Sequence, residues 1–192
     1  MPRIVLPSEE EFIHEKNFPS NYEIIKNIII RHPGLRFHEL RTETGLANGT
    51  LQHHIGELVK SKTINTEYDK SIPRYFSKEI SAESRIIIKR LSQITTSRII
   101  KLLLKKECQT FVQLVKYSKK SAGTVSVYKS MLLKDGIIQG DTHECKYCKD
   151  SVNRIKYRLV NPEKVRTLVH EYGKTSLQKT ADNLADVFLA IR

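Results

Sequence analysis

Apolar residues recur with a helical period at the start of the chain and predict three successive helices. An isoleucine-rich stripe predicts a helix over 22–31, and a short helix over 36–44 precedes a turn at Gly45. A third helix is predicted over 48–60, with small polar residues at its start. Its apolar positions are Leu51, Ile55, Leu58 and Val59. They lie at i, i+4, i+7 and i+8, which is one helical face.

The same pattern returns later in the chain at a constant offset. Gly49-Thr50 falls on Gly123-Thr124, so the offset is 123 − 49 = 74 residues. It predicts helices over 96–106, 110–118 and 121–134. One register holds without a gap for about forty residues, which predicts two copies of one unit.

After each third helix the period changes to two, which predicts a hairpin. The first hairpin turns near Asp69-Lys70-Ser71, and Pro73 cannot donate to a ladder, so its strand is expected at a sheet edge. In the second, apolar residues are expected on one face and basic ones on the other: Ile155, Tyr157 and Leu159 against Arg154, Lys156 and Arg158. Three helices and a hairpin form a winged helix-turn-helix unit. The expected fold class is therefore mainly α with small β wings (α+β): two tandem winged helix-turn-helix domains plus C-terminal helices.

The expected organisation has five parts. They are an extended or partly ordered segment 1–19, a first winged-helix domain 20–80, a connecting helix within 81–93, a second domain 94–160, and C-terminal helices 161–192. Asn161-Pro162 is a typical helix start. A later apolar stripe runs from Leu177 to Phe188 and must be covered, either by the winged helices or by its copy in a homodimer.

Positive charge is concentrated in the second part of the chain. Residues 1–80 hold 11 Lys+Arg and 11 Asp+Glu, whereas residues 81–192 hold 22 and 10, which is the whole net charge of +12. Such an asymmetry favours a polyanionic partner over a surface that serves solubility alone. The start lacks a secretory signal pattern, and no apolar run reaches the roughly 18 residues of a membrane span. With three cysteines and no disulfide framework, a reduced, cytoplasmic, nucleoid-associated protein is expected.

Two stretches carry a family resemblance: "GLRFHELRTETGLANGTLQHHIGELVKSKTI" and "TFVQLVKYSKKSAGTVSVYKSMLLKDGII". They resemble winged-helix transcriptional regulators of the MarR/ArsR-like kind, particularly archaeal ones, over roughly residues 20–160. The resemblance implies a third helix in the major groove and a wing on the backbone or minor groove of double-stranded DNA.

The outward positions of the first copy's third helix suit base reading. Asn and Gln pair with adenine edges, and Thr and His donate to bases or phosphates. These positions are Asn48, Thr50, Gln52 and His53, with Arg36 as a further DNA contact. A solvated surface residue is the alternative for His53, and His54 borders the apolar stripe and is expected to pack.

The second copy suits phosphate contacts. Its candidates are Lys119, Lys120, Ser121, Thr124, Ser126 and Lys129. The wing candidates are Lys70, Arg74, Lys146, Lys149, Arg154, Lys156 and Arg158. We therefore expect the neutral first copy to read bases and the basic second copy to supply affinity.

Cys145 and Cys148 form a C-x-x-C beside His143. These three residues can be zinc ligands, with His170 or a partner subunit's pair completing the site and Cys108 expected to lie too far away. A redox-sensing dithiol and two incidental loop cysteines are the alternatives. No cofactor is otherwise expected.

Three other functions compete with DNA-binding regulation. An RNA-binding or RNA-polymerase-associated tandem winged-helix factor fits the net positive charge equally well. A protein-interaction module does not require a basic surface, so the charge argues against that alternative. An enzyme is not expected, since the chain has no phosphate-binding Gly loop, H-E-x-x-H or nucleophile elbow.

Overall fold

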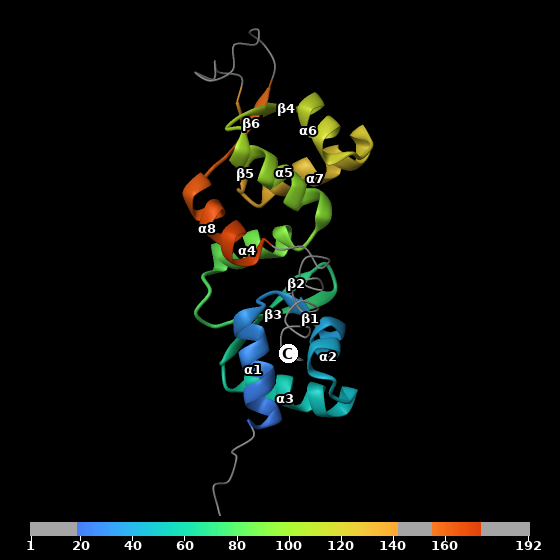
Figure 1. Cartoon of the computed structure of the whole chain (residues 1–192), viewed down its shortest axis with the longest axis vertical. Coiled ribbons are helices and arrows are strands. Elements are labelled where there is room, and N and C mark those ends of the chain that lie inside the picture. Colours follow the sequence, from blue (N-terminus) through green and yellow to red (C-terminus); the bar gives the residue numbers. More distant parts are fainter. Residues whose placement is uncertain (1–18, 142–154, 174–192) are drawn as a thin grey trace, which may run out of the picture.

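The computed structural model describes residues 19–141 and 155–173. The first unit holds α1 (Asn21–Arg31), β1 (Leu35–Arg36), α2 (Phe37–Thr44), α3 (Asn48–Lys60), β2 (Ile64–Asp69) and β3 (Ile72–Ser77). The second holds α5 (Ile94–Lys105), β4 (Gln109–Thr110), α6 (Phe111–Ser118), α7 (Ala122–Lys134), β5 (Ile138–Asp141), β6 (Lys156–Leu159) and α8 (Pro162–Tyr172). Between them runs α4 (Ala82–Leu91), and the two units are stacked along the long axis of the molecule (Figure 1).

The fold is α+β, with two winged helix-turn-helix units that repeat the same elements. α2 and α6 begin 111 − 37 = 74 residues apart, and α3 and α7 begin 122 − 48 = 74 residues apart. The turn from α2 to α3 begins with the left-handed Gly45 (φ 66°), and the turn from α6 to α7 begins with the left-handed Lys119 (φ 54°). Glycine adopts that conformation without strain, which explains the turn signal in the first copy.

Each unit has its own apolar core. The first is built by the inward stripes of the three helices together with Tyr75, and the fully buried residues include Ile25, Leu40 and Leu51. The second gathers the apolar faces of α4 to α8 and the strands around Leu114. Phe76 of β3 is buried in this second cluster although it comes from the first sheet. The first sheet is thereby joined to α4 and the second unit.

Both sheets contain a strand that the sequence pattern did not reveal. The strand orders are β1-β3-β2 and β4-β6-β5, so β3 and β6 are central. The expectation that Pro73 marks an edge strand was therefore wrong. β1 pairs with Tyr75 and Arg74 and the chain then turns into α2, so the proline nitrogen lies just past the end of β1.

The alternation expected for the second hairpin was also wrong in part. Tyr157 and Leu159 face the core as expected, but Ile155 is 51% exposed and Lys156 only 8%. Lys156 pairs with Thr110 of β4 on one side and with Asp141 of β5 on the other. Lys156 therefore lies in a central strand, and this position could not be anticipated without β4.

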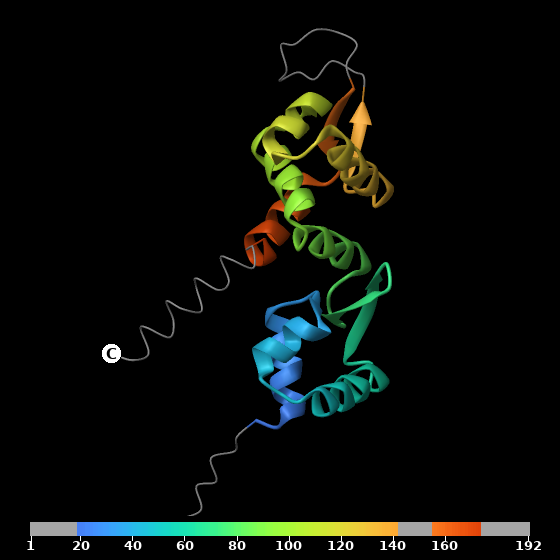
Figure 2. The same cartoon turned by 90° about the vertical axis from the view of Figure 1, so that its right-hand side faces the viewer.

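The first hairpin lies beside α4 (Figure 2), and polar side chains of α4 and of the residues just after it contact the hairpin. Arg85 Nε donates to Glu67 Oε1 at 2.9 Å. Gln93 Nε2 donates to Asp69 Oδ2 at 3.0 Å, and Arg90 Nη1 lies 3.6 Å from Asp69 Oδ1. One side of the hairpin therefore packs at the junction of the two units, while Lys70 at its turn stays exposed.

Several sequence-based expectations lie outside the described residues. These are the acidic start, the tip of the second wing and the apolar stripe from Leu177 to Phe188. At the C-terminal side, α8 begins as expected, since the Asn161 side chain accepts from Lys164 N at 3.1 Å. None of the helices in the described part of the chain is both long and apolar enough to span a membrane.

Candidate nucleic-acid interface

The first unit presents an uncovered polar face on α3. Leu51, Ile55 and Leu58 point into the core, with exposed fractions of 6% or less. Asn48, Gln52 and His53 are exposed on the opposite side, and Thr50 is half-buried. Arg41 Nη1 on α2 donates to Asn48 Oδ1 at 3.4 Å, which connects the two helices across the turn. The third helix thus offers amide and imidazole groups where an approaching partner can reach them.

Two glycines, Gly49 and Gly56, leave the backbone of α3 without side chains on this face. A Cβ at Gly49 or Gly56 would meet nothing within 4 Å, so no internal contact requires either glycine. Gly56 lies inside the helix, where glycine costs about 1 kcal/mol relative to alanine. A bare, destabilising position on the polar face is explained if another molecule must approach the backbone closely there. Sequence reasoning placed Gly56 outward but drew no function from it.

The two adjacent histidines share one carboxylate. His54 Nδ1 lies 2.9 Å from Glu57 Oε2, and His53 Nε2 lies 3.5 Å from Glu57 Oε1. His54 is half-buried at the border of the stripe, while the His53 side chain is 69% exposed. Donor atoms of all three residues lie within 4.8 Å of one another, so this cluster can hold a metal ion. His53 remains on the outer face of α3, beside the Glu57 carboxylate.

Arg74, proposed as a wing contact, is buried and cannot reach a partner. Its exposed fraction is 2%, and Nη1 donates to the carbonyl of Gly34 at 2.8 Å. Its Nε lies 3.6 Å from Asp69 Oδ2. Burial lowers the pKa of Arg74, and Arg36 lowers it further, while Asp69 opposes both. Arg74 was predicted as a wing contact because it is a basic residue of the hairpin, but contacts with Gly34 and Asp69 draw it inside.

The other first-copy candidates differ in accessibility. Lys70 is exposed at the hairpin turn, with a left-handed φ of 60°. Arg36 is half-buried at the start of α2, and its backbone N–H donates to Glu39 Oε2 at 2.7 Å. Of the basic residues proposed here, Lys70 is thus the one whose side chain is open to a phosphate.

In the second unit, the candidate side chains at the start of α7 are exposed to solvent, whereas those further along the helix are partly buried. Lys119, Lys120 and Ser121 are exposed, and Ser121 Oγ accepts from Thr124 N at 3.3 Å as the helix cap. Thr124 and Ser126 are half-buried. The hydroxyls at the helix start are therefore partly used by the fold itself.

Lys129 is directed toward the protein body instead of outward. Its Nζ lies 5.3 Å from the ring centres of both Phe111 and Tyr157, a cation–π arrangement. Lys156 is buried and not available to a phosphate, whereas Lys129 is half-buried against these rings. Arg158 remains exposed on β6, with Nη2 3.6 Å from Asp141 Oδ2.

The remaining predicted site residues cannot be placed. They lie outside the described residues and comprise Lys146, Lys149, Arg154 and the zinc candidates His143, Cys145 and Cys148. Cys108 is buried and disulfide-bonded, contrary to the expectation of reduced cysteines. In that state Cys108 has no thiolate to offer as a fourth zinc ligand.

The comparisons with known proteins agree with this geometry. A family model described as an N-terminal HTH (helix-turn-helix) domain matches residues 20–88, which cover the first unit and most of α4. A comparison with curated proteins found no match. The chain therefore carries a helix-turn-helix domain, a class of non-catalytic DNA-binding module in which the second helix of the motif reads the groove. In this chain that helix is α3.

Proposed function

We propose that the protein is a DNA-binding transcription regulator whose α3 enters the major groove and discriminates bases. The observation that carries the proposal is the uncovered face of α3, which lies within the matched residues and presents Asn48, Gln52 and His53. Amide side chains at these positions can form paired hydrogen bonds with adenine edges. The resemblance to MarR/ArsR-like regulators extends the proposal to both units.

The second unit supplies phosphate contacts in this proposal. The predicted cations that are exposed in the described residues are Lys70, Lys119, Lys120 and Arg158. If all four neutralise phosphates, affinity falls on the order of a hundredfold between 50 and 200 mM salt. Further phosphate contacts by the predicted cations outside the described residues would steepen this dependence.

We further propose that the protein works in the cytoplasm, at the nucleoid, as a homodimer joined through its C-terminal residues.

Mobility-shift titrations test the proposal. Genomic duplex fragments, a scrambled duplex of equal length and double-stranded RNA are compared at two salt concentrations. A genomic duplex bound at least tenfold more tightly than the scrambled one supports base reading. Equal or tighter binding of RNA overturns it in favour of an RNA-binding function, because the deep, narrow major groove of RNA does not admit a helix. No binding to any of the three overturns both and favours a protein partner.

A further inference from the structure

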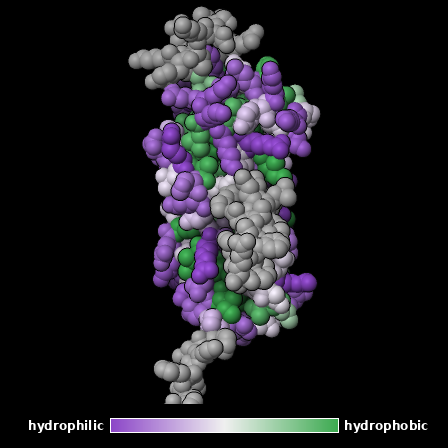
Figure 3. Space-filling view, viewed as in Figure 1, coloured by the Kyte–Doolittle hydropathy of each residue, from purple (hydrophilic) through white to green (hydrophobic). Residues whose placement is uncertain are grey.

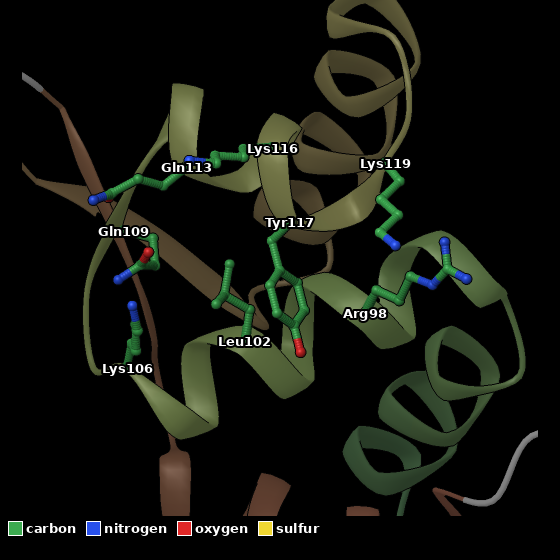
Figure 4. A pocket seen from close by; sticks show the side chains of 8 residues that line it. All are labelled: Arg98, Leu102, Lys106, Gln109, Gln113, Lys116, Tyr117 and Lys119. Carbon is green, nitrogen blue, oxygen red and sulfur yellow. The ribbon is translucent and has the colours of Figure 1, made fainter.

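A pocket lies between α5 and α6 of the second unit (Figure 4), and of the cations proposed above for DNA phosphates it includes Lys119. The pocket has a volume of about 690 Å³, within the range of roughly 300–1,000 Å³ that is usual for small-molecule sites. It is lined by Arg98, Leu102, Lys106, Gln109, Gln113, Lys116, Tyr117 and Lys119. Hydrophilic residues are widespread on the face drawn in Figure 3, so polarity alone does not mark a site, and this pocket is distinguished by its shape and by the sign of its charge.

All the charged side chains that line the pocket are positive. Of the eight lining residues, all of them described, four are lysine or arginine and none is a carboxylate. Cations that converge on a concave surface raise the local potential and favour an anion. Because no lining acid neutralises them, an anionic ligand gains from several cations at once.

The side chains also differ from one end of the pocket to the other (Figure 4). Arg98 and Lys119 lie beside each other at one end, and Lys106 and Gln109 at the other, with Leu102 and Tyr117 between them. Arg98 Nη1 donates to the carbonyl of Ser118 at 3.1 Å, which fixes the guanidinium in place. Its other N–H groups can serve a phosphate, for which arginine and lysine are the preferred partners.

The middle of the pocket suits a flat ring. Tyr117 is 47% exposed, so an aromatic face is open beside the apolar side chain of Leu102. Gln113 Oε1 accepts from the backbone N–H of Thr110 at 2.8 Å, which leaves its amide N–H groups as donors. Stacking on an aromatic ring next to donor groups is the usual recognition of a nucleobase.

We propose that this pocket binds a free nucleotide, with the phosphates at Arg98 and Lys119 and the base between Leu102 and Tyr117. The inference goes beyond DNA binding, since it assigns a small ligand to a surface other than α3. It does not depend on DNA binding, because the ligand can be measured with no DNA present.

Calorimetric titration of the full chain without DNA, at constant ionic strength, tests the assignment. The probes are ATP, pyrophosphate and adenosine. ATP is expected to bind more tightly than either fragment, because only ATP fills both the phosphate end and the middle of the pocket. Lys119→Asn should weaken ATP binding about tenfold, the loss of one charge-assisted hydrogen bond. Lys106→Gln should weaken ATP binding less, because Lys106 lies at the other end and adds only to the positive potential of the pocket. Asparagine tolerates the left-handed backbone at position 119, so that variant is expected to fold.

Two further variants separate a built site from general attraction. Lys105→Gln is the matched control, because Lys105 precedes Lys106 but does not line the pocket. It should leave ATP affinity unchanged, and an equal loss in this variant overturns the proposal. Tyr117→Ser should remove the advantage of ATP over pyrophosphate. Pyrophosphate that binds wild-type protein as tightly as ATP, or no heat from any probe, likewise overturns it. Thermal unfolding of each variant verifies its fold.

Discussion

Arg90 of α4 forms an ion pair with Asp135, the residue at which α7 ends. The same guanidinium faces Asp69 in the hairpin of the first unit, with Nη1 3.6 Å from Oδ1. One arginine on the connecting helix thus touches a carboxylate from each winged-helix unit. Because its side chain is 8% exposed, the contact also excludes most water. We infer that Arg90 sets how α3 and α7 are oriented relative to each other.

Loss of this arginine should destabilise the protein strongly. Arg90→Leu leaves the largely buried Asp135 carboxylate without its cation, while Asp69 keeps Arg74 and Gln93, and is expected to lower the free energy of unfolding by about 3 kcal/mol. Arg158→Leu is the control, since its pair with Asp141 is exposed and should contribute at most about 1 kcal/mol. Urea unfolding measures both. If Arg90→Leu and Asp135→Asn are simply additive in the double mutant, the two residues are not coupled.

Arg74 and Lys70 lie in the same hairpin but should respond differently to substitution. Arg74→Met removes a buried donor to Gly34 and is expected to cost about 2–4 kcal/mol of stability. Lys70→Asn suits the left-handed turn and should leave stability nearly unchanged, while the slope of log affinity against log salt falls by about one. Unfolding and salt titrations measure the two effects. A salt slope unchanged in Lys70→Asn means that this turn does not touch a phosphate.

The bounds of α3 could be predicted from the sequence, whereas the burial of Arg74 could not. The bounds of α3 could be read from the period of its stripe, because a helix that buries one face must repeat its apolar residues. The burial of Arg74 depends on Gly34, Asp69 and Ser92, which are near it only after folding. A basic residue in a hairpin is usually solvated, so its local pattern gave no sign of these partners.

The short strands explain the remaining errors. β1 and β4 are two residues long, too short for any alternation of their own. Each of them pairs with a strand of the predicted hairpin and makes that strand central in its sheet. Lys129 was misplaced for a related reason, since the aromatic rings that attract it come from α6 and β6. The open start of α7 and the open face of α3 follow from helical periodicity alone.

The base-reading role of α3 predicts a loss of discrimination without a loss of fold. Gln52→Ala combined with His53→Ala should reduce the preference for genomic over scrambled duplex by about 1–3 kcal/mol per lost base contact. Affinity for scrambled duplex should change little, because phosphate contacts remain. His38→Ala, at an exposed position on α2, is the control. Full discrimination in the double mutant would show that other residues read the bases.

Alkaline pH should weaken the first core through Tyr75. This residue is 6% exposed, and burial raises the pKa of its hydroxyl above 10.0. The folded state thus keeps a proton that the unfolded state loses, so stability is constant below about pH 10 and falls as pH rises further. Tyr75→Phe should flatten this decline, and Tyr117→Phe, at an exposed ring, should not. Denaturant midpoints between pH 8 and 11 measure the difference.

Gly56 provides the sharpest separation of stability from function. Gly56→Ala places a methyl group where it meets nothing within 4 Å in the protein, and should stabilise α3 by about 1 kcal/mol. If α3 lies in a groove, the same methyl crowds the DNA and weakens duplex binding roughly tenfold. Thermal unfolding and duplex titration measure the two effects in one variant. Glu43→Ala on the exposed face of α2 is the control and should leave DNA affinity unchanged. A Gly56→Ala protein that is more stable and binds DNA as tightly as before would mean that this face of α3 does not contact DNA.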